Sequence, residues 1–183
     1  MGNLPIFIDE LSELANTLTL ESRASEPDID AIPKVLAALD SFSECVRYLN
    51  TRRSKGAILT LNSEASVQDA LYLMLRPWIL DLIPENPGEK IANSFAIKDF
   101  TSKVNRFVLE AKYIRNKDHG RSIASEINDD IENYRYHPYC DDLIFYIYDP
   151  ESLIPDSLAL RAHVTSLRSY GDKVLRCHCV IKP

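Results

Sequence analysis

Residues 143–148 read LIFYIY, an uninterrupted run of apolar residues that favour β-strands. A strand with apolar side chains on both faces has to be covered on both faces, so this run predicts a strand in the middle of a sheet. Asp149 and Pro150 follow the run and end it. A chain with such a strand needs helices on both sides of its sheet, which is the arrangement of an α/β sandwich.

Helices and strands alternate along the chain after residue 60, as the spacing of apolar residues indicates. The expected helices cover residues 68–76 (with an N-cap at Asn62 or Ser63), 122–136 and 157–169, and the expected strands cover 94–100, 106–113, 143–148 and 173–181. The expected connections are a turn-like link at 101–105, which makes a hairpin of the first two strands, a loop at 117–121, and a continuation of the first helix over 78–83. This order predicts an α/β fold with a mixed β-sheet sandwiched by helices.

Two further helices are expected ahead of this region. Apolar residues recur with helical spacing over residues 5–20 and again from about residue 30 to residue 53, and the polar stretch between them contains Pro27. We therefore divide the chain into an N-terminal helical segment, residues 1–55, and a second domain, residues 56–183. A length of 183 residues suits one domain with a small appendage.

Neither membrane insertion nor secretion is indicated. No stretch approaches the roughly 18 consecutive apolar residues of a transmembrane helix, and the first residues include acids where a signal peptide has a basic region. The 4 cysteines, Cys45, Cys140, Cys177 and Cys179, form no CxxC pair, and we interpret Cys177 and Cys179 as small core residues. We expect a cytoplasmic protein with no membrane partner.

Charge is unevenly distributed along the chain. The net charge of −6 disfavours non-specific binding of nucleic acid. The window from Lys98 to Arg121, however, carries a charge of about +4. The candidates for contact with phosphate in this window are Lys98, Lys103, Arg115, Lys117 and Arg121. A solvated hairpin and loop is the alternative interpretation of the same charges.

The predicted hairpin gathers the residues that carry chemistry. Its first strand holds Asp99, and its second strand holds Glu110, Ala111 and Lys112. Residues two apart on a strand share a face, so Glu110 and Lys112 project together, and closure of the hairpin brings Asp99 near them. Two carboxylates and the carbonyl of Ala111 are oxygen ligands of the kind that Mg²⁺ prefers. The alternative interpretation is an exposed Glu and Lys on a solvated face.

The segment DFTSKVNRFVLEAK, residues 99–112, resembles the core motif of the PD-(D/E)xK nucleases, in the branch of the DpnII/MboI-type restriction endonucleases. The resemblance continues through the helix NDDIENYRYHP and the strand LIFYIYDPE, and the segment SEASVQDALYLMLRP is similar to the opening helix of that branch. It covers roughly residues 60–183. Relatives often carry a Ser-Arg pair shortly before the motif aspartate, and this chain lacks that arginine.

The resemblance implies a restriction-endonuclease-like fold and cleavage of nucleic acid that depends on Mg²⁺ or Mn²⁺. By the same resemblance, Asp99 and Glu110 correspond to the metal-binding acids and Lys112 to the catalytic lysine. Glu64 corresponds to an acid on the opening helix that in many relatives completes the metal site.

The leading hypothesis is a metal-dependent endonuclease that cuts DNA, in which Lys112 orients or activates the attacking water. A role as an effector of anti-phage defence follows only from what such families commonly do. Two alternatives stay open: a catalytically silent or partner-activated subunit of a larger complex, and a nuclease that cleaves RNA, although DNA is favoured. The expected partners are nucleic acid and either a second copy of the chain or a larger defence complex.

Overall fold

The run LIFYIY lies at the centre of the sheet, as predicted. The computed structural model describes residues 26–52, 56–84 and 99–183, so the expected helix at 5–20, most of the strand expected at 94–100 and Lys98 lie outside it. The strand β4 (Asp142–Tyr148) pairs in parallel with β3 (Phe107–Tyr113) on one side and with β6 (Lys173–Lys182) on the other. Its core residues are fully buried because both of its faces are covered.

Three further strands complete a six-stranded mixed sheet of order β1-β2-β3-β4-β6-β5. They are β1 (Leu82–Pro84), β2 (Phe100–Ser102) and β5 (Ser166–Tyr170). The strands β1, β2 and β3 form an antiparallel meander, and β5 pairs antiparallel with β6. The expectation of a mixed sheet is therefore confirmed.

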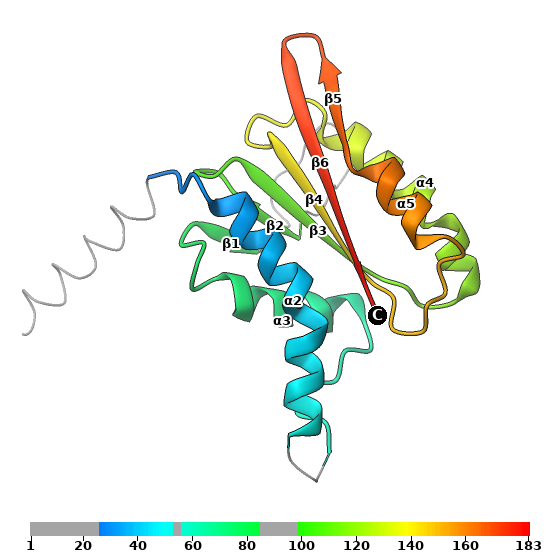
Figure 1. Ribbon diagram of the computed structural model, residues 1–183. Coiled ribbons are helices and arrows are strands. Elements are labelled where there is room, and N and C mark those ends of the chain that lie inside the picture. The colour runs from blue at the N-terminus through cyan, green and yellow to red at the C-terminus, as the bar shows by residue number, and fades with distance from the viewer. Residues whose placement is uncertain (1–25, 53–55, 85–98) are drawn as a thin grey trace, which may run out of the picture.

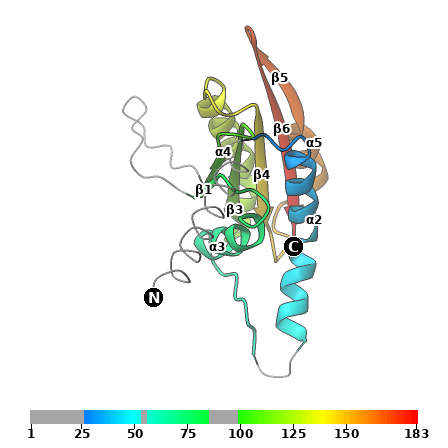
Figure 2. The same ribbon diagram turned by 90° about the vertical axis from the view of Figure 1, so that its left-hand side faces the viewer.

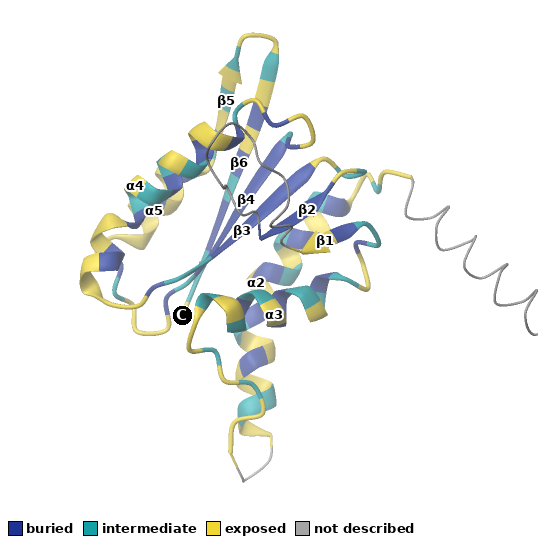
Figure 3. Cartoon of the chain, turned by 180° about the vertical axis from the view of Figure 1, so that it is seen from behind, coloured by how far each residue is buried: buried dark blue, intermediate teal, exposed yellow. Residues whose placement is uncertain are grey.

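Helices cover both faces of this sheet. They are α2 (Ala31–Thr51) and α3 (Glu64–Leu75) on one face, and α4 (Lys117–Tyr134) and α5 (Ser157–Val164) on the other. Figure 1 shows α4 and α5 together on one side of the strands and α2 with α3 on the other. In Figure 2, where the left-hand side of Figure 1 faces the viewer, the strands are seen spread side by side, and the buried residues concentrate on the strands between the helices (Figure 3). The fold is an α/β sandwich of the restriction-endonuclease-like kind.

Each face of the sheet has its own hydrophobic core because side chains alternate along the strands. In β3, Leu109 and Ala111 point toward α2 and α3, whereas Val108 points toward α4 and α5. The helix α2 is part of the first core through residues such as Leu39 and Phe42. The division of the chain at residue 55 stays a prediction. Among the described residues, no helix has the length and hydropathy needed to cross a membrane.

Three of the expected connecting segments differ from the structure. The link at 101–105 begins inside β2, since Thr101 and Ser102 pair with β3. Residues 78–83 do not continue α3: the chain turns after Leu75, and residues from Leu82 enter β1. The loop expected at 117–121 is the start of α4, whose N-cap Asn116 accepts a hydrogen bond from the backbone of His119 at 2.9 Å. Gly120 misled the prediction because glycine usually marks a loop.

The prediction of a helix at 157–169 was also wrong for the second half of this range. It ends at Val164, and Thr165 is extended, with φ −69° and ψ 99°. The chain then forms the edge strand β5 and returns through a turn at Gly171, whose φ of 62° is left-handed and therefore suits glycine. Residues 166–170 form a strand because they pair with β6, which follows directly after this turn.

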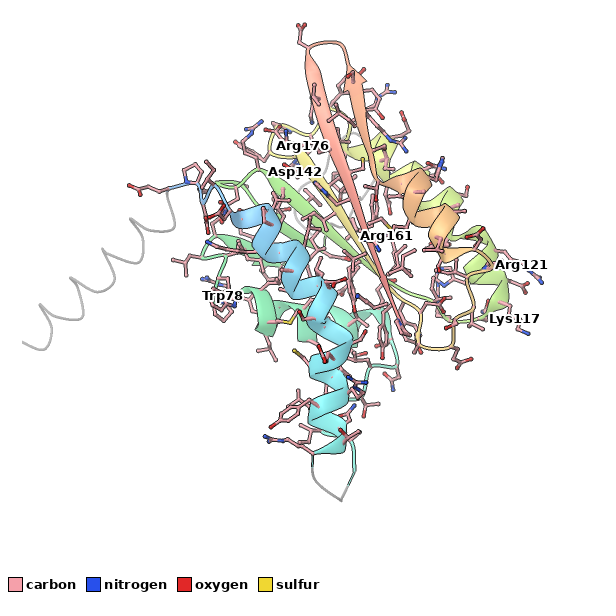
Figure 4. All side chains as sticks on the ribbon, in the orientation of Figure 1. Trp78, Lys117, Arg121, Asp142, Arg161 and Arg176 are labelled. Carbon is pink, nitrogen blue, oxygen red and sulfur yellow. The ribbon has the colours of Figure 1, made fainter. Side chains whose placement is uncertain are left out.

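Asp142, a buried acid at the start of β4, pairs with basic residues of β6. Asp142 of β4 accepts hydrogen bonds from Arg176 at 2.6 and 2.8 Å and interacts with His178 at 2.8 Å. Figure 4 shows Asp142 and Arg176 side by side on neighbouring strands. Cys177 and Cys179 point to the opposite face and are buried in the second core, as their interpretation as core residues predicts.

Candidate active site

Glu110 and Lys112 project from β3 toward α4. They share a face, as the two-residue period of a strand requires, and each meets a residue of that helix. The hydroxyl of Tyr134 donates a very short hydrogen bond to Oε1 of Glu110. The ammonium of Lys112 lies 2.9 Å from Oδ2 of Asp130. The alternative of a solvated Glu–Lys pair is therefore excluded, since Glu110 is only 4% exposed.

Asp99 comes directly before β2 and lies beside Glu110. Phe100 pairs with Leu109 in antiparallel register, so the preceding residue reaches the position of Glu110. Oδ2 of Asp99 accepts a hydrogen bond from the backbone N–H of Ala111 at 2.5 Å, and Oδ1 accepts one from the side chain of Gln68 at 2.8 Å. The structure thus brings together the three residues expected from the hairpin.

The backbone of Ala111 faces the same place. In a strand, the N–H and C=O of one residue point to the same edge. Because the N–H of Ala111 meets the Asp99 carboxylate, the carbonyl of Ala111 also points toward Asp99 and away from β4. This orientation fits its expected role as an oxygen ligand.

The two carboxylates sit in a low-dielectric environment close to each other. Burial, helped by the charge of Glu64, raises the pKa of Asp99 to about 6 against the hydrogen bond from Ala111. Burial, and then the charge of Asp99, raise the pKa of Glu110 well above its ordinary value. Two acids that repel each other inside a protein are a place where a divalent cation is favourable.

Glu64 is the first residue of α3, which Ser63 caps through a hydrogen bond to the backbone N–H of Ser66. Its charge also contributes to raising the pKa of Lys112, so this carboxylate lies within electrostatic reach of both Asp99 and Lys112. A pocket opens beside Asp99 between α3 and the β1–β2 edge, lined also by Gln68 and Tyr72. Of the candidate metal ligands, Asp99 is the one that lines this pocket.

The donor set fits a hard divalent cation. Mg²⁺ commonly takes one or two protein carboxylates and keeps several waters, and two carboxylates with one carbonyl meet that need. Among the residues that the structure describes, no group of three or more His, Cys, Asp or Glu side chains is close enough to form a complete metal cage. Asp99 and Glu110 would thus hold the ion with the carbonyl of Ala111, and Glu64 stands further away as a candidate.

Most of the expected phosphate contacts gather around the start of α4. Arg115, Lys117 and Arg121 are exposed there, beyond the end of β3, and Lys117 and Arg121 lie together in Figure 4. Arg121 also pairs with Asp118 at 3.3 Å. Lys103 is exposed at the opposite end of β3, 5.4 Å from the ring centre of Tyr139, so the structure does not bring it to the other bases.

Asp130 and Tyr134, which contact Lys112 and Glu110, were not among the residues expected at this site. The signal was present in the helix NDDIENYRYHP, where these residues are four apart and therefore on one helical face. Only the packing of α4 against β3 shows which side chains they meet.

A mixed sheet between helices, with two buried acids and a lysine on adjoining strands, defines a nuclease of the PD-(D/E)xK class. Residues 33–182 match the model of the DpnII–MboI restriction endonuclease family, and the chain belongs to this family. Membership implies DNA nuclease activity. No curated protein and no solved structure matches the chain.

Proposed function

We propose that this protein is a Mg²⁺-dependent endonuclease that hydrolyses phosphodiester bonds in DNA, with Mn²⁺ able to replace Mg²⁺. The observation that carries the proposal is the placement of Asp99, Glu110 and Lys112 within one partly closed site. Asp99, Glu110 and the carbonyl of Ala111 hold the ion, and Glu64 contributes from α3. When bound, the cation lowers the pKa of a water and stabilises charge on the scissile phosphate.

Lys112 acts as a charged donor in this proposal. Burial lowers the pKa of Lys112, but the carboxylate of Asp130 outweighs burial and the net shift is upward. The ammonium therefore keeps its protons near neutral pH and donates hydrogen bonds to the attacking water or to a phosphate oxygen. Orientation of the water, and not removal of its proton, is the role that this charge state supports.

The bases at the start of α4 contact the DNA backbone in the same proposal. Arg115, Lys117 and Arg121 extend from the site along the surface, and exposed bases of this kind bind phosphates without reading sequence. Lys103, at the turn of the hairpin, and Lys98, which lies outside the described residues, are further proposed contacts. As its biological setting we propose the cytoplasm, where the protein would act against phage DNA. It would do so as a homodimer or within a larger defence complex.

The test is cleavage of supercoiled plasmid by the full chain with Mg²⁺ or Mn²⁺ and with EDTA. Asp99→Asn keeps the shape of the side chain and removes one anionic ligand, so we expect cleavage to fall about 100-fold or more. Asp69→Asn is the matched control, because Asp69 is an exposed acid of α3 that lines the same pocket. Equal cleavage by Asp99→Asn and the wild type would refute the assigned site.

Two other outcomes select the alternatives. Preference for single-stranded RNA over DNA in competition would make the protein a ribonuclease. A wild type that binds Mn²⁺ and does not cut either substrate would point to a subunit that a partner activates.

A further inference from the structure

The helix α4 contacts both residues of the Glu-x-Lys pair through two side chains of its own. We infer that Tyr134 and Asp130 are positioning residues for this active site: Tyr134 fixes Glu110 for metal binding, and Asp130 fixes Lys112 for the chemical step. This inference rests on the proposed function and assigns to α4 a part in it.

The spacing of the two pairs matches. Two residues along a strand advance about 6.7 Å, and four residues along an α-helix advance about 6 Å. The helix runs antiparallel to β3, so the later residue, Tyr134, meets Glu110 and the earlier residue, Asp130, meets Lys112. A helix with acid and tyrosine four apart therefore holds both side chains of the pair at once.

Tyr134 restrains the Glu110 carboxylate. Tyr134 is 3% exposed, and its hydroxyl donates a hydrogen bond to the Glu110 carboxylate. It occupies Oε1 of Glu110 and leaves Oε2 for a cation. Hydrogen bonds of this kind to a ligand carboxylate set its orientation, and their loss typically weakens metal binding about 10- to 100-fold.

Asp130 restrains the Lys112 ammonium. A lysine side chain has many rotamers, and an ion pair with both partners largely shielded from solvent reduces that freedom. The side chain of Lys112 is 15% exposed and that of Asp130 is 25% exposed. Asp130 meets Lys112 on the face of β3 that α4 covers, and its carboxylate directs the ammonium.

The apolar face of α4 makes this arrangement rigid. Ile123, Ile127 and Ile131 are buried against the sheet in the second core, in the same helix as the two positioning residues. Gly120 allows the first turn to approach the backbone of Leu153. The helix is therefore held at a fixed distance from β3 before any metal or substrate arrives.

Mn²⁺ alone tests the role of Tyr134. Calorimetric titration of Tyr134→Phe, which keeps the ring and removes the hydroxyl, is expected to show about 10-fold or greater weakening of Mn²⁺ affinity. Tyr146→Phe is the control, because Tyr146 is an equally buried tyrosine on the opposite face of the sheet. Mn²⁺ affinity equal to that of the wild type in a folded Tyr134→Phe would overturn the role of Tyr134.

Steady-state cleavage tests the role of Asp130. We expect Asp130→Asn to lower kcat about 10-fold or more while KM for DNA and Mn²⁺ affinity stay near wild type, and Asp130→Glu to restore part of kcat. Asp129→Asn changes the adjacent exposed acid of α4 and serves as the control. An unchanged kcat, or a loss shared equally by kcat and metal affinity, would contradict the inference.

The two proposals fail in different ways. If the wild type neither binds Mn²⁺ nor cuts DNA, the proposed function is wrong and the positioning roles fall with it. If the wild type binds and cuts and both variants behave like it, only the positioning roles are wrong. Should Tyr134→Phe not fold, the kcat of Asp130→Asn decides the inference.

Discussion

At the scale of single residues, the site is defined by the cost of burying charge. Asp99 and Glu110 would each be ionised in water at neutral pH, but burial and mutual repulsion raise the pKa of both. The local hydrogen bonds from Ala111, Gln68 and Tyr134 offset only part of this cost. The cation of the proposed function would offset the rest, and without it the site is electrostatically unfavourable.

This cost predicts a dependence of stability on pH. The pKa of Asp99 is 3.8 in an ordinary environment and about 6 in the folded protein. Between these values the folded state binds more protons than the unfolded state, so this contribution to stability is fully present below about pH 4 and is lost as the pH rises through about 6. We expect the Tm of the metal-free wild type to fall relative to that of Asp99→Asn across this window, as measured by calorimetry.

Comparison with the variant is needed because other groups titrate with the opposite sign. Burial raises the pKa of Asp142, but the hydrogen bonds from His178 and Arg176 outweigh it and hold this pKa below its ordinary value. If the Tm values of the wild type and Asp99→Asn change with pH in parallel, the pKa of Asp99 is not raised in the folded protein.

At the scale of elements, the position of α4 matters most for the site. The helix begins at the N-cap Asn116, packs its apolar face on the sheet, and carries both residues that meet Glu110 and Lys112. Its close approach to the loop after β4 occurs at Gly120, where a Cβ would lie 2.5 Å from the carbonyl oxygen of Leu153. Both partners in that contact are backbone, so neither can move aside cheaply.

Gly120→Ala therefore tests the seating of α4. Helix propensity alone predicts a gain of about 1 kcal/mol in the free energy of unfolding. Forcing apart well-packed elements costs about 1–3 kcal/mol, and with the gain set against it we expect a net loss of up to about 2 kcal/mol in urea unfolding. Ser125→Ala, at an exposed position of the same helix, should be neutral or slightly stabilising. A more stable Gly120→Ala would mean that α4 is not in close contact with residue 153.

At the scale of the whole molecule, charge is separated. The chain carries a net charge of −6, yet Arg115, Lys117 and Arg121 are exposed together at the start of α4. An acidic protein of this kind is expected to bind DNA through one restricted surface and to be repelled elsewhere.

The dependence of DNA binding on salt measures this surface. Removing one phosphate contact reduces the slope of log K against log salt concentration by about one. We expect Lys117→Gln to show this reduction in fluorescence anisotropy titrations, equally for unrelated DNA sequences. Lys34→Gln, which changes a lysine of α2 whose ammonium pairs with Asp28, should leave the slope unchanged. A slope in Lys117→Gln equal to that of the wild type would exclude Lys117 from the DNA surface.

Properties that depend on neighbours in the chain were correctly predicted from the sequence. The central strand followed from its uninterrupted apolar run, and the shared face of Glu110 and Lys112 followed from the two-residue period of a strand. The N-cap of α3 is Ser63, one of the two expected candidates, although the helix begins at Glu64 and thus earlier than the expected residue 68. In each case a few adjacent residues contain the whole signal, because backbone geometry sets the period.

Only the tertiary structure decided the features that depend on distant partners. Residues 166–170 are a strand because β6 folds back beside them across a short turn, and this nearby pairing is not evident from the spacing of their own apolar residues. Residues 117–121 are helical although Gly120 usually marks a loop. The contacts of Tyr134 and Asp130, and the raised pKa of Asp99, exist only when α4 and the sheet have packed and excluded water. The sequence by itself determined which residues are proposed to carry the chemistry. Long-range packing determined their partners and their charge, because burial and contact between elements are not properties of a local segment.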